Sequence, residues 1–251
     1  MTPLAHHDLQ ADDKAASPGV DASAPGTLER KQTKHPVSDL TELASNYLKS
    51  LLNGDRQAAC TLILEAVDRG VPIRDVYLGV FQPVQREVGR LWQINIVSVA
   101  VEHFCTAATQ MVMSQLFPRI LSPTKNGLSM VGCCVGEELH ELGVRMVCDF
   151  FEMDGWDTHY MGSNCRWDSL NSVLETRHTD MLCLSVTMPQ NLGMARKMIR
   201  EAKARFPKTK VMVGGFPFQL NPGLAEPLGA HGWARDAEEA LTLAKSLVRA
   251  A

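Results

Sequence analysis

The sequence predicts an α/β protein in which an N-terminal four-helix bundle precedes a parallel five-stranded sheet domain of the flavodoxin or Rossmann-like type. Residues 37–120 repeat apolar side chains at helical spacing, with short polar breaks between the runs. Residues 128–234 instead alternate short apolar runs with helical segments. That alternation is typical of strands joined by right-handed crossover helices.

The first 36 residues differ in composition from the rest of the chain. They are rich in Ala, Asp, Pro, Gly, Ser and Lys and contain almost no large apolar side chains. Such a segment buries too little surface to offset its ordering entropy. We therefore expect a disordered tail over 1–36, which includes the pair His6-His7. The bundle is expected over 37–122 and the sheet domain over 123–251.

The bundle is expected to contain four helices joined by short connections. They cover residues 37–52, 58–67, 72–92 and 97–117. Pro83 lies inside the third helix and is expected to kink or locally disrupt it, because proline lacks the backbone N–H. Pro118 is expected to close the fourth helix.

The sheet domain is expected to contain five strands. They cover residues 128–135, 157–161, 181–186, 210–214 and 230–233. The dense apolar residues of 142–151 predict a buried helix after the first strand. A chain of 251 residues can form two modest domains, each with its own core.

The loop after the first expected strand carries Glu138, His140 and Gly143 in the pattern Glu-x-His-x-x-Gly. A residue between a strand and the next helix lies at the carboxyl edge of the sheet, where open α/β folds bind ligands. Imidazole is a good ligand for transition metals, and a nearby carboxylate can orient the ring. Taken alone, such a histidine is also compatible with an ordinary surface position.

Small residues follow two further strands at the same expected edge. Ser185 and Thr187 come 41 residues after the loop motif, and Gly214-Gly215 follow after 26 more. The hydroxyls can hydrogen-bond a ligand, and the glycines allow a close backbone approach. A glycine turn after a buried strand would explain the glycines individually but not the three matching distances.

This three-part spacing resembles the signature of the cobalamin-binding domain shared by methionine synthase, the mutases, the corrinoid methyl carriers and the cobalamin photoreceptors. Two residues depart from the usual pattern, since Glu138 replaces Asp and Thr187 replaces Leu. The resemblance implies cobalamin as the cofactor and His140 as the lower ligand of its cobalt. It also implies that the cofactor's nucleotide tail runs past the residues at the strand ends.

A second constellation lies in the bundle, where Trp92 is followed by nine residues and then Glu102-His103. This element resembles the light-sensing cobalamin proteins, in which the tryptophan covers the upper axial group and the Glu-His pair lines the same pocket. Methyl-carrier bundles share the Glu-His pair but usually lack the tryptophan pattern. Gln93 replaces the histidine that follows the tryptophan in the photoreceptor repressors, so their histidine-ligated photoproduct is not expected here.

The resemblance favours a light sensor rather than an enzyme. Light would break the cobalt–carbon bond of bound alkylcobalamin, with adenosylcobalamin the favoured form and methylcobalamin the alternative. The chain resembles stand-alone cobalamin antirepressors, so we expect a light-dependent homo-oligomer or a separate protein partner. It also resembles photocobilins, which carry a bilin such as biliverdin; the candidate lining residues are Trp156, His159, Trp167 and His178. A corrinoid methyl carrier is the main alternative, and cobalamin storage also remains open.

Composition excludes several other classes. The net charge of −3 gives no electrostatic footprint for nucleic acid, and no DNA-binding domain is expected. No apolar stretch approaches the roughly 20 residues of a membrane helix, and no secretory signal is visible, so a cytoplasmic protein is expected. The seven cysteines show no CxxC spacing and are expected to be reduced. Cys133-Cys134 beside the loop could be catalytic, but buried strand residues are the simpler interpretation.

Overall fold

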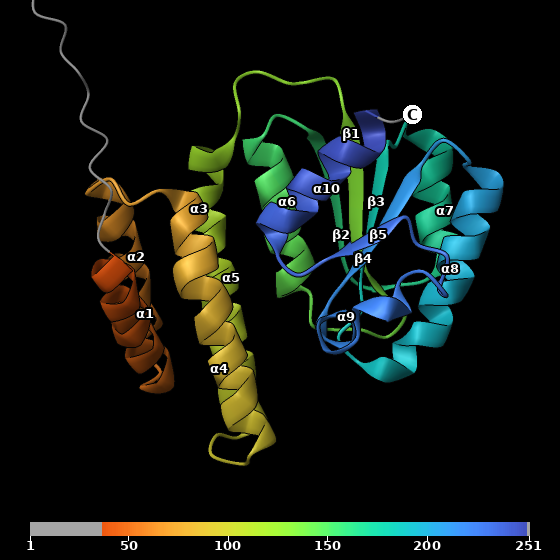
Figure 1. Cartoon of the computed structure of the whole chain (residues 1–251). Helices are drawn as coiled ribbons and strands as arrows, with labels where there is room; N and C mark the ends of the chain where they lie inside the picture. Colours follow the sequence, from red (N-terminus) through yellow and green to blue (C-terminus); the bar gives the residue numbers. More distant parts are fainter. Residues whose placement is uncertain (1–36, 250–251) are drawn as a thin grey trace, which may run out of the picture. The chain divides into compact units, whose positions relative to one another are not determined.

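A helical bundle precedes a five-stranded parallel sheet in the computed structural model, as the sequence predicts (Figure 1). The structure describes residues 37–249, so the tail expected over 1–36 lies outside the described residues. The bundle comprises α1 (Val37–Leu52), α2 (Arg56–Asp68), a continuous third helix and α5 (Val99–Ile120). The third helix is made of α3 (Ile73–Val76), the π turn η1 (Tyr77–Phe81) and α4 (Gln82–Gln93).

Pro83 and Pro118 affect their helices differently. The disruption expected at Pro83 takes the form of the π turn η1, after which the Gln82 N–H bonds to the Tyr77 carbonyl. The expectation that Pro118 closes the last helix is wrong, because α5 continues to Ile120. Leu116 and Ile120 are both buried and lie one turn apart on the same face. Burying Ile120 therefore favours one more turn, although Pro118 donates no backbone hydrogen bond.

The sheet has the order β2-β1-β3-β4-β5, and every neighbouring pair is parallel. Its strands are β1 (Ser129–Val135), β2 (Asp157–Cys165), β3 (Met181–Ser185), β4 (Lys210–Gly214) and β5 (Gly232–Ala234). This is the flavodoxin-like order, in which β1 lies between β2 and β3. Strand β2 is longer than expected because it continues past residue 161 through register shifts against β1.

Helices cover both faces of the sheet (Figure 1). On one face α6 (Leu142–Met153) and α10 (Ala237–Arg249) pack on side chains such as Met130 and Cys134. On the other, α7 (Trp167–Thr176) and α8 (Leu192–Arg205) pack on Val131 and Cys133. The short helices η2 (Pro189–Asn191) and α9 (Phe216–Leu220) follow the ends of β3 and β4, and η3 (Pro222–Leu224) follows α9. Both faces are buried, as expected for a parallel sheet.

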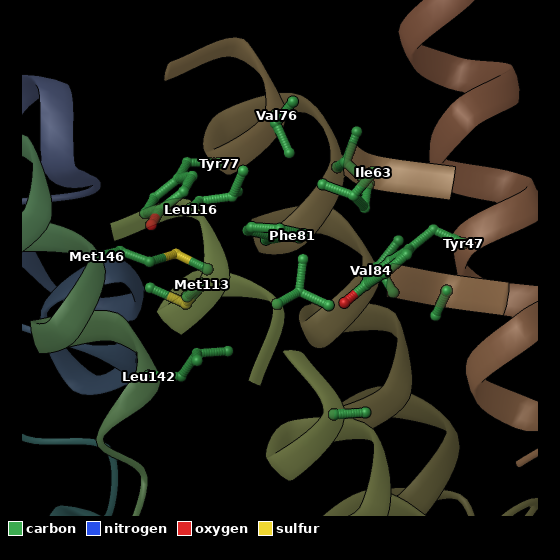
Figure 2. Close-up of a cluster of buried hydrophobic side chains, with 14 of the residues drawn as sticks. Tyr47, Ile63, Val76, Tyr77, Phe81, Val84, Met113, Leu116, Leu142 and Met146 are labelled. Carbon is green, nitrogen blue, oxygen red and sulfur yellow. The ribbon is translucent and has the colours of Figure 1, made fainter. Parts of the chain in front are cut away.

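The bundle and the sheet domain share a core, which differs from the separate cores expected from chain length. Leu142 and Met146 of α6 belong to the same buried cluster as Tyr77 and Met113 of the bundle. Figure 2 shows Leu142 and Met146 of α6 directed toward the bundle, with Met146 beside Met113. The Tyr77 hydroxyl also donates a hydrogen bond of 2.7 Å to the buried Asp149 carboxylate. Helix α6 therefore fixes the bundle beside the sheet.

All seven cysteines are buried and free, as expected. Cys133 and Cys134 lie within β1, in agreement with the buried-strand interpretation. Within residues 37–249, no helix is long and apolar enough to cross a membrane.

Candidate functional site

The loop between β1 and α6 holds His140 against a buried carboxylate. The His140 ring Nδ1 bonds to Glu138 Oε1, and the same oxygen accepts the His140 backbone N–H at 3.2 Å. With Nδ1 engaged, Nε2 of this histidine has no hydrogen-bond partner in the part of the chain that the structure describes. In the neutral ring with a proton on Nδ1, Nε2 carries the lone pair that a metal ion needs.

Glu138 joins this loop to the loop that follows β3. Its other oxygen, Oε2, accepts the backbone N–H groups of Thr187 at 2.9 Å and Met188 at 2.7 Å, and the Asn191 amide at 3.4 Å. The residue is only 1% exposed. Burial alone would raise the pKa of this carboxyl, but the hydrogen bonds from His140 and the two N–H groups lower it to about 2. A carboxylate so held is a fixed anion at neutral pH.

The same contact acts in reverse on the histidine. The Glu138 carboxylate raises the pKa of His140, while partial burial opposes it. The His140 side chain remains 41% exposed and lines a cavity. Within residues 37–249, no three His, Cys, Asp or Glu side chains form a metal site of their own.

The glycines of the motif serve different purposes. Gly215 has a φ of +109°, and a Cβ there would lie 1.9 Å from the Val186 carbonyl oxygen. The protein's own backbone therefore accounts for Gly215, rather than the ligand approach that we expected. A Cβ on Gly214 would meet the Ala234 carbonyl at 3.3 Å. A Cβ on Gly143, in contrast, would meet nothing within 4 Å.

A cavity of about 1040 Å³ lies where the bundle faces the carboxyl ends of the strands. This volume is at the upper end for small-molecule sites and suits a large cofactor. Nine of the ten predicted site residues line it: Trp92, Glu102, His103, His140, Gly143, Ser185, Thr187, Gly214 and Gly215. The tenth, Glu138, lies buried behind the histidine. The cavity and the free imidazole nitrogen fit a corrinoid bound through His140.

The bundle side of the cavity carries polar side chains beyond those predicted from the sequence. Trp92 lies near the end of α4, and the Glu102 carboxylate lies 3.7 Å from Nε2 of the adjacent His103 in the first turn of α5. Thr106 and Gln110 also line the cavity, and so does Gln85 of α4. Positions 102, 106 and 110 are spaced by four. That helical spacing could have revealed Thr106 and Gln110 from the sequence.

Three of the four residues considered for a bilin site lie apart from one another. Trp156 is fully buried and packs edge-on against Phe151 on the α6 and α10 face of the sheet. Trp167 packs on the opposite face. His178 is exposed and bonds to Asp180 before β3. These residues do not form one binding site.

Comparison with known proteins identifies the class to which this fold and site belong. Two family models, each described as a B12 binding domain, match residues 43–117 and 128–242. The chain belongs to the two-domain cobalamin-binding family, and cobalamin or a related corrinoid is its cofactor.

The relatives are named as corrinoid proteins. The chain is 28% identical to dimethylamine corrinoid protein 3 of Methanosarcina mazei over 167 residues. The matched region covers 66% of this chain and 96% of that protein. A corrinoid protein of Desulfitobacterium hafniense is 21% identical over 83% of this chain and 99% of its own length. The monomethylamine corrinoid protein of Methanosarcina barkeri has the same fold, with a TM-score of 0.72, 18% identity and coverage of 84% of this chain and 99% of that chain.

These relatives contradict the light-sensor prediction, which is wrong. That prediction rested on the spacing between Trp92 and Glu102-His103. The structure places these side chains on the cavity, but their position there does not distinguish a light sensor from a methyl carrier. The comparisons support neither the adenosyl form, nor a bilin, nor a light-dependent oligomer. The expectation that the chain is not itself an enzyme agrees with relatives named as corrinoid proteins.

Proposed function

We propose that this protein is a corrinoid carrier of methyl groups that works with separate methyltransferases. The observation that carries the proposal is the 28% identity to a dimethylamine corrinoid protein over 96% of that protein's length. The arrangement of His140 and Glu138 supports it, because this pair offers one imidazole nitrogen to a metal. Methylcobalamin is then the working form, in place of the adenosyl form favoured from the sequence.

When bound, the corrinoid supplies a cobalt centre that accepts a methyl group from one partner and gives it to another. The chain's own residues bind and orient this centre. His140 would ligate the cobalt, and Glu138 would fix the ring and keep its proton on Nδ1. Ser185 and Thr187 would offer hydroxyls to the nucleotide tail, and Gly143 would leave cavity space for the cofactor.

A carrier must expose the upper face of its cofactor to other proteins. The rim of the cavity includes Val99, Leu139 and Phe216, whose side chains are exposed, Leu139 to 69%. The cavity therefore reaches the surface, where a partner's active site can approach it. Trp92 covers the upper group between transfers in this account.

Labelled methyl transfer tests the proposal. Protein loaded with cobalamin and chemically reduced would be treated with ¹⁴C-methyl iodide, then passed through a desalting column. We expect about one label per bound cobalamin, and transfer of that label to a thiol when a corrinoid-dependent methyltransferase is added. Cobalamin should stay on the protein throughout. Label that never joins the protein-bound cofactor, or that cannot be chased to any thiol, would overturn the proposal.

A further inference from the structure

A chain of hydrogen-bonded side chains runs from the bundle core to the cavity. It consists of Tyr47, Thr109, Gln85, Thr106 and Glu102, here called the polar chain. The Tyr47 hydroxyl lies 2.9 Å from Thr109 Oγ1, and Gln85 Nε2 donates to that oxygen at 2.7 Å. Thr106 Oγ1 lies 3.2 Å from Gln85 Oε1 and 3.1 Å from Glu102 Oε1. The polar chain therefore connects α1, α4 and α5.

The Gln85 amide is held in one orientation. Its nitrogen has two hydrogens, and both are used, one by Thr109 Oγ1 and the other by the Cys105 carbonyl at 3.2 Å. Flipping the amide would break both bonds, so the Gln85 carbonyl oxygen must face Thr106. Tyr47 and Thr109, which hold this end of the Gln85 amide, are fully buried.

The cavity end of the polar chain has more acceptors than donors. The Thr106 hydroxyl has one hydrogen, but both Gln85 Oε1 and Glu102 Oε1 lie within bonding distance of it. It can satisfy only one of them at a time. The Glu102 carboxylate is 16% exposed and lines the cavity, so it is placed to accept a further hydrogen from a ligand there. Such a donor would release Thr106 to bond Gln85.

We infer that Gln85 is a positioning residue for the bound corrinoid. By accepting the Thr106 hydrogen, it leaves Glu102 Oε1 free to accept from a neutral hydrogen-bond donor on the bundle side of the cofactor. Two donors have this chemistry: an amide on the corrin periphery, or a hydrogen on the upper axial group. The inference rests on the proposed function, since it assigns Gln85 to the same cofactor site.

Binding measurements test the inference without any methyl transfer. Dissociation constants for methylcobalamin and aquacobalamin would be measured for the native protein and for Gln85→Met, Thr106→Val and Thr106→Ser. One lost hydrogen bond is worth about a 3- to 10-fold weakening. We expect that loss for Gln85→Met, which leaves Glu102 as the acceptor for the Thr106 hydrogen. Thr106→Val, which removes that hydrogen, and Thr106→Ser, which keeps the hydroxyl and both acceptors, should stay within about twofold. Thermal unfolding of the apo variants checks that each one folds.

Two further comparisons identify which cofactor group donates the hydrogen bond and whether Gln85 acts through Glu102. Equal weakening for both cobalamins would assign the donor to the corrin periphery, whereas weakening for aquacobalamin alone would assign it to the axial group. In a Glu102→Ala background, Gln85→Met should have no further effect, because Gln85 acts through that carboxylate. Additive losses, an unchanged affinity in Gln85→Met, or a weakening in Thr106→Val equal to that in Gln85→Met would overturn the inference. If Gln85→Met does not fold, Gln85→Leu replaces it in both comparisons.

The two proposals fail separately. A protein that binds cobalamin and carries methyl groups, but shows additive losses, retains the proposed function and loses the role of Gln85. A protein that shows the coupling but transfers no label retains the role of Gln85 and loses the methyl-carrier function.

Discussion

Replacing Gly143 with alanine should strengthen the fold while weakening cofactor binding. Gly143 is the second residue of α6 and lines the cavity. Its φ is not positive, so alanine can adopt the same backbone conformation. A Cβ there would meet no protein atom within 4 Å and would instead occupy cavity space.

The two effects can be estimated separately. Alanine in a helix is favoured over glycine by about 0.5–1 kcal/mol, which should raise the Tm of the apo protein by roughly 1–4 °C. Overfilling a packed site costs about 1–3 kcal/mol, which corresponds to roughly a 5- to 150-fold loss of cobalamin affinity. Gly143→Leu should lose more affinity than Gly143→Ala because its side chain is larger.

Gly193→Ala is the matched control. Gly193 is also the second residue of its helix, α8, and a Cβ there would likewise meet nothing within 4 Å. It does not line the cavity. Calorimetry on the apo proteins and equilibrium dialysis with cobalamin would separate the two effects. The reasoning is refuted if Gly143→Ala binds cobalamin like the native protein, or if Gly193→Ala loses affinity to the same extent.

Three other substitutions test the site and its support. Glu138→Gln should cost about 1–3 kcal/mol of stability and lower the fraction of cobalamin ligated by His140. The reason is that an amide NH₂ facing Nδ1 favours a proton on Nε2, which then cannot bind the metal. Absorption spectra of the bound cofactor would detect the change, and an unchanged spectrum would contradict the prediction. Burial raises the pKa of Asp149 from 3.8 to about 6. Its contribution to the free energy of unfolding should therefore be full below about pH 4 and fall by about 3 kcal/mol as the pH rises through 6. Asp149→Asn should remove this component from urea-unfolding profiles, and identical profiles would count against it. Gly215→Ala should destabilise by about 3 kcal/mol or more, or prevent folding, because its Cβ meets the Val186 carbonyl; a soluble variant with native Tm would refute that steric argument.

The sequence predicted the elements well because local periodicity decides them. Apolar spacing located the bundle helices and the five strands within a few residues. The end of α5 was missed, since burial of Ile120 depends on tertiary contacts that the local pattern does not contain. The shared core at α6 was missed for the same reason, because Met146 contributes to the bundle only after the two domains pack together.

The sequence predicted which residues lie at the site but not the function of the site. Nine of the ten predicted residues line one cavity. Six of them lie on the sheet domain, where strand ends of a parallel sheet converge at one edge, and the other three lie on the bundle helices α4 and α5. The backbone bonds from Thr187 and Met188 to Glu138 were not predictable, since they join two loops 49 and 50 residues apart. The light-sensor error has a related origin, because a tryptophan that lines a cofactor cavity does not specify the chemistry of the cofactor.

Ligation of cobalt by His140 is the central claim, and electron paramagnetic resonance of bound cob(II)alamin tests it most directly. Protein grown with ¹⁵N-histidine should replace the three-line nitrogen splitting of the lower ligand with a two-line splitting. His140→Ala should lose that label-dependent change. A three-line pattern in the labelled protein, or a two-line pattern that survives in His140→Ala, would contradict the assignment of this histidine as the lower ligand.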